Sequence, residues 1–137
     1  MVKFCMKLED NVNVKAWLKV AYDDELTCIS FFAHRDVPPS AACFVSQQMA
    51  EKLLKALCVF FGEELRKVHD LKKLATILEK HVSSIFNLDE EFNVLNKYYT
   101  TTRYPGDFPE GFSWQDAEKA FEAATRIKDF VLDKIKN

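Results

Sequence analysis

Glycine and proline are scarce in this chain, and they gather at a few positions. The 137 residues include three glycines and four prolines, which lie at Pro38–Pro39, at Gly62 and within residues 104–111. Glycine and proline are the residues that most strongly interrupt helices. The intervals between them are therefore free to form long elements, and the chain is expected to fold from a few continuous segments.

Apolar side chains recur every three or four residues in these segments, which is the pattern of helices with one buried face. The expected helices cover residues 13–33, 40–62, 70–82, 87–99 and 113–135. None of the segments shows the alternation typical of a strand. The second is the most apolar and is expected to be central. The pattern predicts an all-α, up-and-down bundle of four to five helices in a single domain over residues 1–137.

Three of the expected helices begin with residues that favour capping. Asp70 is suited to cap the third helix. Asn87 followed by Glu90 has the spacing of a capping box at the start of the fourth. Ser113 and Asp116 repeat this spacing before the fifth.

The composition is that of a folded globular domain, with 48% hydrophobic and 29% charged residues. No stretch is long and apolar enough to span a membrane or to serve as a secretory signal, so we expect a cytoplasmic protein. The net charge of −2 gives no general attraction for nucleic acids. The four cysteines are scattered and are expected to be buried, so the sequence predicts no metal site and no cofactor.

Three motifs carry a resemblance to a known family. The run 47–57, QQMAEKLLKAL, is followed by His69-Asp70-Leu71 and by Arg103-Tyr104-Pro105. In this order and spacing they resemble the HEPN domain, the helical family named for higher eukaryotes and prokaryotes nucleotide-binding. The resemblance implies a helical bundle that is commonly homodimeric. It also implies nucleotide binding, toxin–antitoxin pairing or RNA cleavage, and a separate minimal nucleotidyltransferase as partner.

His69 is the first candidate for chemistry. Histidine titrates near neutrality and can bind a phosphate or move a proton. The cations around it at the expected start of the third helix are Arg66, Lys67, Lys72 and Lys73. Helix N-termini attract anions, so a phosphate is expected to fit there. The alternative is that His69 bonds a backbone group and ties the second helix to the third.

Polar residues interrupt the apolar second helix in two neighbouring stripes. These stripes are Gln48–Lys52–Lys55 and Gln47–Glu51–Lys55. Glu51 is expected to be partly buried and to need a cationic partner, either Lys55 or Arg103. We interpret Gln48, Glu51 and Asp70 as a structural polar network. Lys52 and Lys55 either belong to it or contact a nucleotide phosphate.

Arg103 and Tyr104 are the third candidate. Arginine binds phosphate or carboxylate in bidentate fashion, and tyrosine offers a stacking face, so the pair suits a nucleotide site. The same side chains could instead anchor the segment between the last two helices.

Three functional hypotheses follow. The first is a dimeric nucleotide-binding or interaction module that works with a nucleotidyltransferase. The second is a metal-independent ribonuclease toxin that uses His69 with Arg66 or Arg103. The separation of Arg66 and His69 is shorter than in the ribonuclease branch of the family, so a non-catalytic role is favoured. The third is a purely structural interaction protein.

The phenylalanine content also suggests a homodimer. Twelve phenylalanines include the adjacent pairs Phe31–Phe32 and Phe60–Phe61. Adjacent residues on a helix point about 100° apart, so both members of a pair cannot face one core. Some of these rings are therefore expected at an interface between two copies of the chain.

Overall fold

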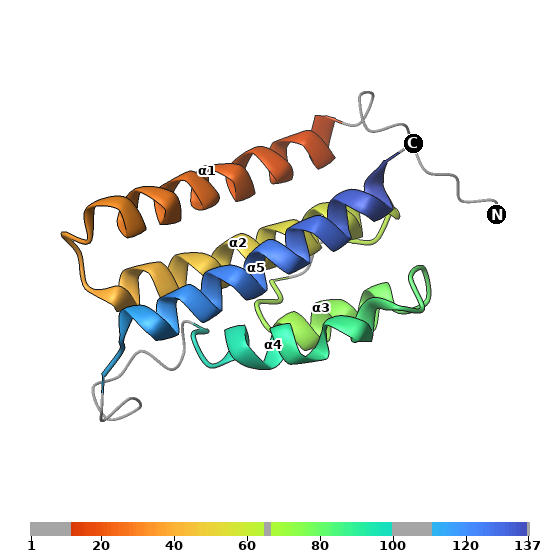
Figure 1. The fold of residues 1–137 in the computed structure, drawn as a ribbon. Helices are drawn as coiled ribbons and strands as arrows, with labels where there is room; N and C mark the ends of the chain where they lie inside the picture. Colours follow the sequence, from red (N-terminus) through yellow and green to blue (C-terminus); the bar gives the residue numbers. More distant parts are fainter. Residues whose placement is uncertain (1–11, 65–66, 100–110, 137) are drawn as a thin grey trace.

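The protein is described by a computed structural model that covers residues 12–64, 67–99 and 111–136. Within these ranges it forms five α-helices and one short 3-10 helix, and no strand (Figure 1). The elements are α1 (Val12–His34), α2 (Pro39–Phe60), α3 (Leu71–Leu78), η2 (Ile85–Leu88), α4 (Asp89–Asn96) and α5 (Trp114–Ile135). The predicted all-α class is confirmed.

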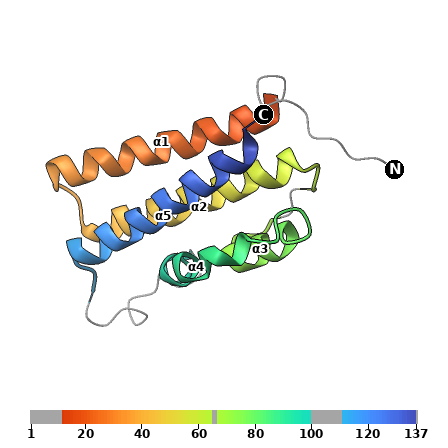
Figure 2. The same ribbon diagram turned by 45° about the vertical axis from the view of Figure 1, so that its right-hand side comes forward.

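Helix α2 is the central element, as its apolar sequence predicts. It contacts α1, α3, α4 and α5. Both ribbon views show α5 running alongside α2, with α1 on one side of this pair and α3 and α4 on the other (Figures 1 and 2). The polar side chains of α2 can therefore find partners on several other helices.

Proline and glycine define the two ends of α2. Pro38 has extended backbone angles, and Pro39 occupies the first helical turn, where its missing N–H is no loss. At the other end Gly62 has φ +75°. Its N–H bonds Val59 O at 3.0 Å, and the N–H of Glu63 bonds Cys58 O at 2.9 Å. These two bonds form a Schellman motif, which requires the left-handed conformation that glycine adopts most easily.

Helix α3 runs parallel to α2, which departs from simple up-and-down alternation. His69, just before α3, contacts Glu51 in the middle of α2. His81, just after α3, stacks on Phe61 with ring centroids 4.7 Å apart and bonds Glu63 at 2.8 Å, beyond the end of α2. Helix α3 therefore begins beside the middle of α2, next to Glu51, and ends beside the C-terminal end of α2.

Two of the three predicted helix starts are confirmed. Asp70 accepts hydrogen bonds from the N–H groups of Lys72 and Lys73. Ser113 and Asp116 form a complete capping box, and the hydrogen bonds from Ser113 lower the pKa of the Asp116 carboxyl.

The predicted capping box of Asn87 and Glu90 is wrong. Asn87 lies inside the 3-10 helix η2, and the residue before α4 is Leu88, which makes no side-chain cap. A capping residue needs extended backbone angles. Here η2 continues directly into α4, so that conformation does not occur.

The described phenylalanines and cysteines all pack inward. Cys28, Cys43 and Cys58 are buried free thiols, as predicted, and Cys5 lies outside the described residues. Every described phenylalanine is buried or partly buried. Among the described residues, the exposed large apolar side chains are instead Val20, Leu26 and Ile29, all on α1.

Candidate functional site

Glu51 is the centre of a polar cluster between α2 and the start of α3. Its carboxylate accepts a hydrogen bond from Lys55 Nζ at 2.9 Å and lies 3.1 Å from Nδ1 of His69. The Lys55 and Glu51 side chains are 9% and 14% exposed. Of the two partners suggested by the sequence, the structure pairs Glu51 with Lys55, while Arg103 lies outside the described residues. The ammonium of Lys55 also lies 5.6 Å from the centre of the Trp17 ring, on α1.

Gln47 joins this cluster and fixes the segment that carries His69. Its side chain is 1% exposed, and Nε2 donates to the carbonyl oxygen of His69 at 3.3 Å. A buried amide needs such partners. The glutamine that connects α2 to His69 is therefore Gln47, whereas the sequence interpretation names Gln48. Gln47 lies on the same helical stripe as Glu51 and Lys55, and this spacing was the signal that could have identified it.

His69 is held at both its backbone and its ring, yet it remains accessible. The carbonyl oxygen is bound by Gln47 and the ring by Glu51. The side chain is 46% exposed. The ring also lies near Tyr99, with centroids 5.8 Å apart. The suggested tie between the second and third helices is present, but the His69 ring bonds the Glu51 carboxylate and not a backbone group.

The start of α3 is closed by side chains, contrary to the expectation that a phosphate would bind its backbone. Asp70 Oδ1 accepts from the N–H groups of Lys72 and Lys73, at 2.8 and 3.4 Å. Asn96 Oδ1 accepts from the N–H of Leu71 at 3.1 Å, and Asn96 Nδ2 donates to Asp70 Oδ1 at 3.0 Å. The backbone donors that would attract an anion are occupied. Asn96 comes from α4, and no sequence signal indicated this role.

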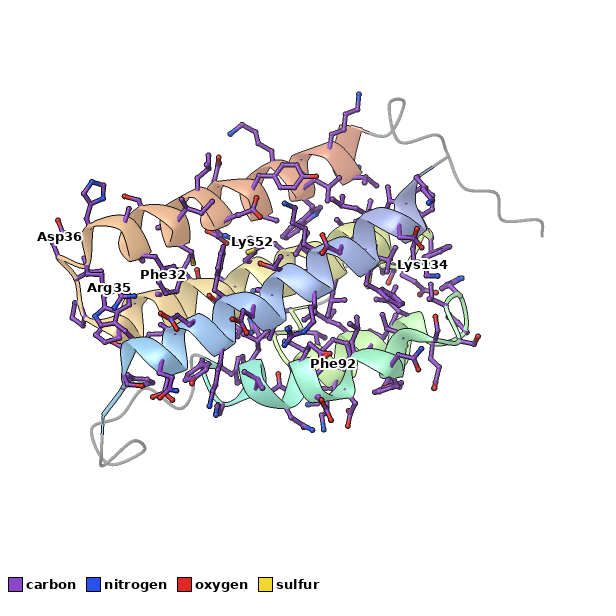
Figure 3. All side chains as sticks on the ribbon, in the orientation of Figure 1. Phe32, Arg35, Asp36, Lys52, Phe92 and Lys134 are labelled. Carbon is purple, nitrogen blue, oxygen red and sulfur yellow. The ribbon has the colours of Figure 1, made fainter. Side chains whose placement is uncertain are left out.

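The two lysines of the 47–57 run are both paired with carboxylates. Lys52 Nζ lies 2.7 Å from Asp24 Oδ2, and these side chains are 28% and 16% exposed. Lys52 sits between α1 and α2 in Figure 3. Lys55 is paired with Glu51 as described above. The charges of both lysines are thus balanced inside the bundle.

Several residues of the sequence hypotheses lie outside the described residues: Arg66, Arg103, Tyr104 and Pro105. Phe112, from the end of the same segment, is described and packs on Phe44 and Tyr98, with centroids 5.4 and 5.8 Å apart. The structure therefore brings together Glu51, Lys55, His69 and Asp70 from the predicted set and adds Gln47 and Asn96.

Metal-binding clusters and membrane-spanning helices were sought in the described ranges. No group of three or more histidine, cysteine, aspartate or glutamate side chains there has a geometry that could hold a metal ion. Nor does any helix within these ranges combine the length and apolarity that crossing a bilayer requires.

Comparison with known proteins relates this fold to one family. No curated protein matches the sequence at a significant level. A crystal structure of an archaeal HEPN homologue is similar, with a TM-score of 0.71 and 30% sequence identity, over 90% of this chain and 98% of that one. The family description "HEPN domain" matches residues 14–135, from the first turn of α1 to the end of α5. Because sequence and fold agree over nearly the whole chain, this protein belongs to the HEPN domain family.

Proposed function

We propose that the protein is a nucleotide-binding module in which His69 contacts a phosphate of the ligand. One observation carries this proposal: the His69 side chain is 46% exposed while its Nδ1 atom is held 3.1 Å from Glu51. The two ring nitrogens lie on opposite sides of the imidazole, so anchoring Nδ1 on Glu51 directs Nε2 away from α2. In a half-exposed side chain, an Nε2 atom oriented in this way donates a hydrogen bond to a phosphate oxygen when the ring is protonated.

Nearby lysines support phosphate binding through charge. Lys67 and Lys73 are exposed and make no ion pair within the described part of the chain. Lys72 is 41% exposed and lies 3.5 Å from Asp89. Exposed cations attract a phosphate through solvent, and salt weakens this attraction. In this proposal Lys52 and Lys55 stabilise the bundle, and they do not contact the ligand.

The proposed module is a homodimer that works with a separate minimal nucleotidyltransferase, as in toxin–antitoxin pairs. The family resemblance suggests these partners, and the exposed aliphatic residues of α1 are suited to such a contact. Leu26 and Ile29 are 64% and 50% exposed. Exposed apolar side chains that lie on one helix favour association with another protein surface.

A second candidate function is a metal-independent ribonuclease, and the pairing of Glu51 with His69 favours it. A carboxylate that orients a histidine is an arrangement suited to proton transfer. His69 would act on RNA as acid or base, with Arg66 or Arg103 holding the phosphate. The third hypothesis, a purely structural cluster, requires neither ligand nor substrate.

A thermal unfolding experiment separates these three functions. The full chain is heated with mono-, di- and triphosphate nucleotides and with a short RNA, and the same RNA is checked for cleavage by electrophoresis. A ligand at about one hundred times its Kd stabilises the folded state by about 2.7 kcal/mol and raises the Tm by on the order of 10 °C. His69→Ala is compared with His34→Ala, because His34 is an exposed histidine at the end of α1 that bonds Ser30.

The proposed function predicts a nucleotide-dependent rise in Tm that His34→Ala retains and His69→Ala loses. RNA cleavage that disappears in His69→Ala supports the ribonuclease instead. If no ligand changes the Tm and His69→Ala only lowers the basal stability, the cluster is structural and nucleotide binding at His69 is refuted.

A further inference from the structure

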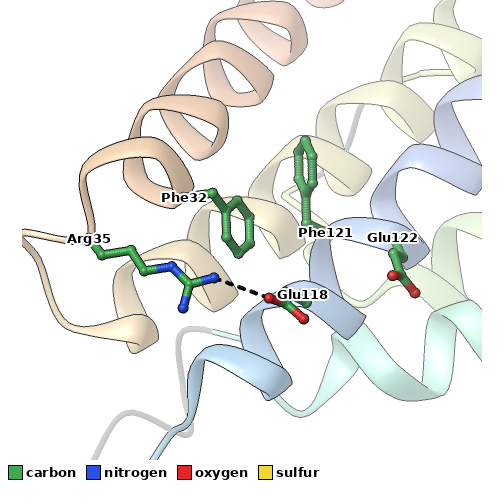
Figure 4. Close-up of a pocket in the computed structure, with 5 residues that line it drawn as sticks. All are labelled: Phe32, Arg35, Glu118, Phe121 and Glu122. Atoms are coloured by element: carbon green, nitrogen blue, oxygen red, sulfur yellow. Dashed lines mark hydrogen bonds and ion pairs between the residues drawn. The ribbon is translucent and has the colours of Figure 1, made fainter.

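A pocket lies at the seam between the end of α1 and the start of α5, away from the polar cluster on α2. It has a volume of about 300 Å³ and is lined by Phe32 and Arg35 together with Glu118, Phe121 and Glu122. Ligand pockets range from roughly 300 to 1,000 Å³, so this one suits a single side chain better than a nucleotide. Figure 4 shows the Phe32 ring between Arg35 and Phe121.

The protein already binds one guanidinium group at this seam, its own Arg35. Arg35 Nη2 lies 3.1 Å from Glu118 Oε1. The Arg35 guanidinium carbon lies 4.8 Å from the centre of the Trp114 ring. A carboxylate and an aromatic face are the two groups that bind a guanidinium best, one through charge and the other through a cation–π contact. Trp114 and Glu118 of α5 thus form a guanidinium-binding site, which Arg35 occupies.

The same helix presents a second pair of this kind. Glu122 follows Glu118 by one turn, and Phe121 follows Trp114 by two turns, so both lie further along the same seam. The Phe121 ring packs against Phe32 with centroids 5.5 Å apart. Glu122 is exposed and makes no ion pair within the described residues. The pocket therefore has an aromatic wall and a carboxylate whose charge is unpaired there.

Electrostatics at the seam favour a cation and disfavour an anion. Glu118 and Glu122 carry two negative charges and Arg35 one positive charge, which leaves the lining with a net charge of −1. A nucleotide phosphate would be repelled, whereas a guanidinium would be attracted and would stack on the rings.

We propose that this pocket binds an arginine side chain of a partner protein. The guanidinium pairs with Glu122 and lies against Phe121 and Phe32, one step along the seam from the place that Arg35 occupies. The stem of the arginine covers the apolar wall of the pocket. This contact is independent of the proposed nucleotide site at His69, which lies on α2 and α3.

The test uses a short capped peptide, acetyl-Gly-Arg-Gly-amide, titrated into the isotope-labelled full chain and followed by NMR chemical shifts. The same peptide with citrulline in place of arginine has nearly the same shape but no charge. Free arginine is a third probe, because it represents a small metabolite instead of a protein side chain. We expect the arginine peptide to shift the signals of Phe32, Phe121 and Glu122, with a Kd on the order of 1 mM.

Two variants and one control test the geometry. Glu122→Gln removes the free carboxylate and is expected to weaken binding by about three- to fivefold, the value of one exposed charge pair. Arg35→Gly removes the one positive charge of the pocket lining and suits a residue whose φ is 49°. It is expected to strengthen binding by about threefold. Glu90→Gln changes an exposed glutamate on α4 and should leave binding unchanged.

The proposal is overturned if the citrulline peptide binds equally well or if Glu122→Gln has no effect on the Kd. It is also overturned if free arginine binds more tightly than the peptide, since the pocket would then select a small molecule. Unfolding curves of Glu122→Gln and Glu90→Gln that match the unaltered chain show that changes in the Kd do not arise from misfolding.

Discussion

Glu51 is the residue on which most of the buried polar cluster depends. Its carboxylate balances the charge of Lys55, whose side chain is 9% exposed, and orients the ring of His69. Glu51→Ala would leave the Lys55 ammonium without its partner in a nearly buried position. Removing one member of such a pair typically costs about 3 kcal/mol. We expect a loss of stability of this size in urea unfolding, together with a loss of the nucleotide-dependent rise in Tm.

The double variant Glu51→Leu/Lys55→Met is the matched control for this prediction. It removes both charges and fills the same volume with apolar groups. Replacing a whole buried pair is often nearly neutral, whereas breaking it is not. Most of the lost stability should therefore return, while the nucleotide-dependent shift stays absent because His69 has lost its anchor. A double variant no more stable than Glu51→Ala would contradict the unpaired-charge explanation.

The buried thiols give a second prediction at the residue scale. Burial raises the pKa of Cys28 and Cys43 to about 11 and that of Cys58 to about 12. At about pH 8 a thiol with a pKa of about 11 is thiolate in roughly one molecule per thousand, and only the thiolate reacts. Iodoacetamide should thus leave these three cysteines unmodified in the folded chain and modify them all in denaturant. Peptide mass spectrometry measures this, and rapid labelling of Cys28 in the folded chain would contradict it.

At the scale of elements, two candidate caps allow a direct comparison. Asp70 accepts two backbone N–H groups of α3 and the side chain of Asn96. Asn87 lies within η2 and does not cap α4. Asp70→Ala should therefore destabilise the chain by about 1–2 kcal/mol, the value of a helix cap. Asn87→Ala should change the stability by less than about 0.5 kcal/mol, as for other exposed positions. Equal losses of stability for the two variants in thermal unfolding would show that Asp70 does not stabilise the chain as a helix cap.

The two predicted capping boxes, Ser113/Asp116 and Asn87/Glu90, also show what local sequence can predict. Ser113 and Asp116 form their box because the chain before α5 is extended at Ser113, with ψ 162°. Asn87 and Glu90 have the same spacing, but the chain before them is already helical. Spacing predicts which residues are able to cap, whereas the conformation of the preceding chain decides whether they do. That conformation depends on packing that the sequence pattern does not contain.

At the scale of the molecule, the helices were predictable and their connections were not. Periodicity placed all five helices and made α2 central, and the 47–57 stripe indicated Lys55 as one of two partners for Glu51. The parallel course of α3 was missed because it depends on how the chain returns along α2. For the same reason the sequence did not indicate that Gln47 binds the His69 carbonyl, that Asn96 binds Leu71 or that Lys52 pairs with Asp24. Each of these contacts joins residues more than 20 positions apart.

The homodimer remains a prediction, but its physical reason has changed. The sequence predicts phenylalanines at the interface, whereas the described phenylalanines pack within the chain. The exposed candidates are aliphatic: Leu26 is 64% and Ile29 is 50% exposed, and both lie on α1.

Leu26→Glu places a charge on this surface of α1 without touching the core, so it should convert a dimer to a monomer with little effect on the folded chain. Light scattering at micromolar concentration measures the mass. Asn93→Glu, which adds the same charge at an exposed position of α4, should leave the dimer intact. A monomer before any substitution, or equal dissociation by both variants, would show that this surface of α1 does not join two copies of the chain.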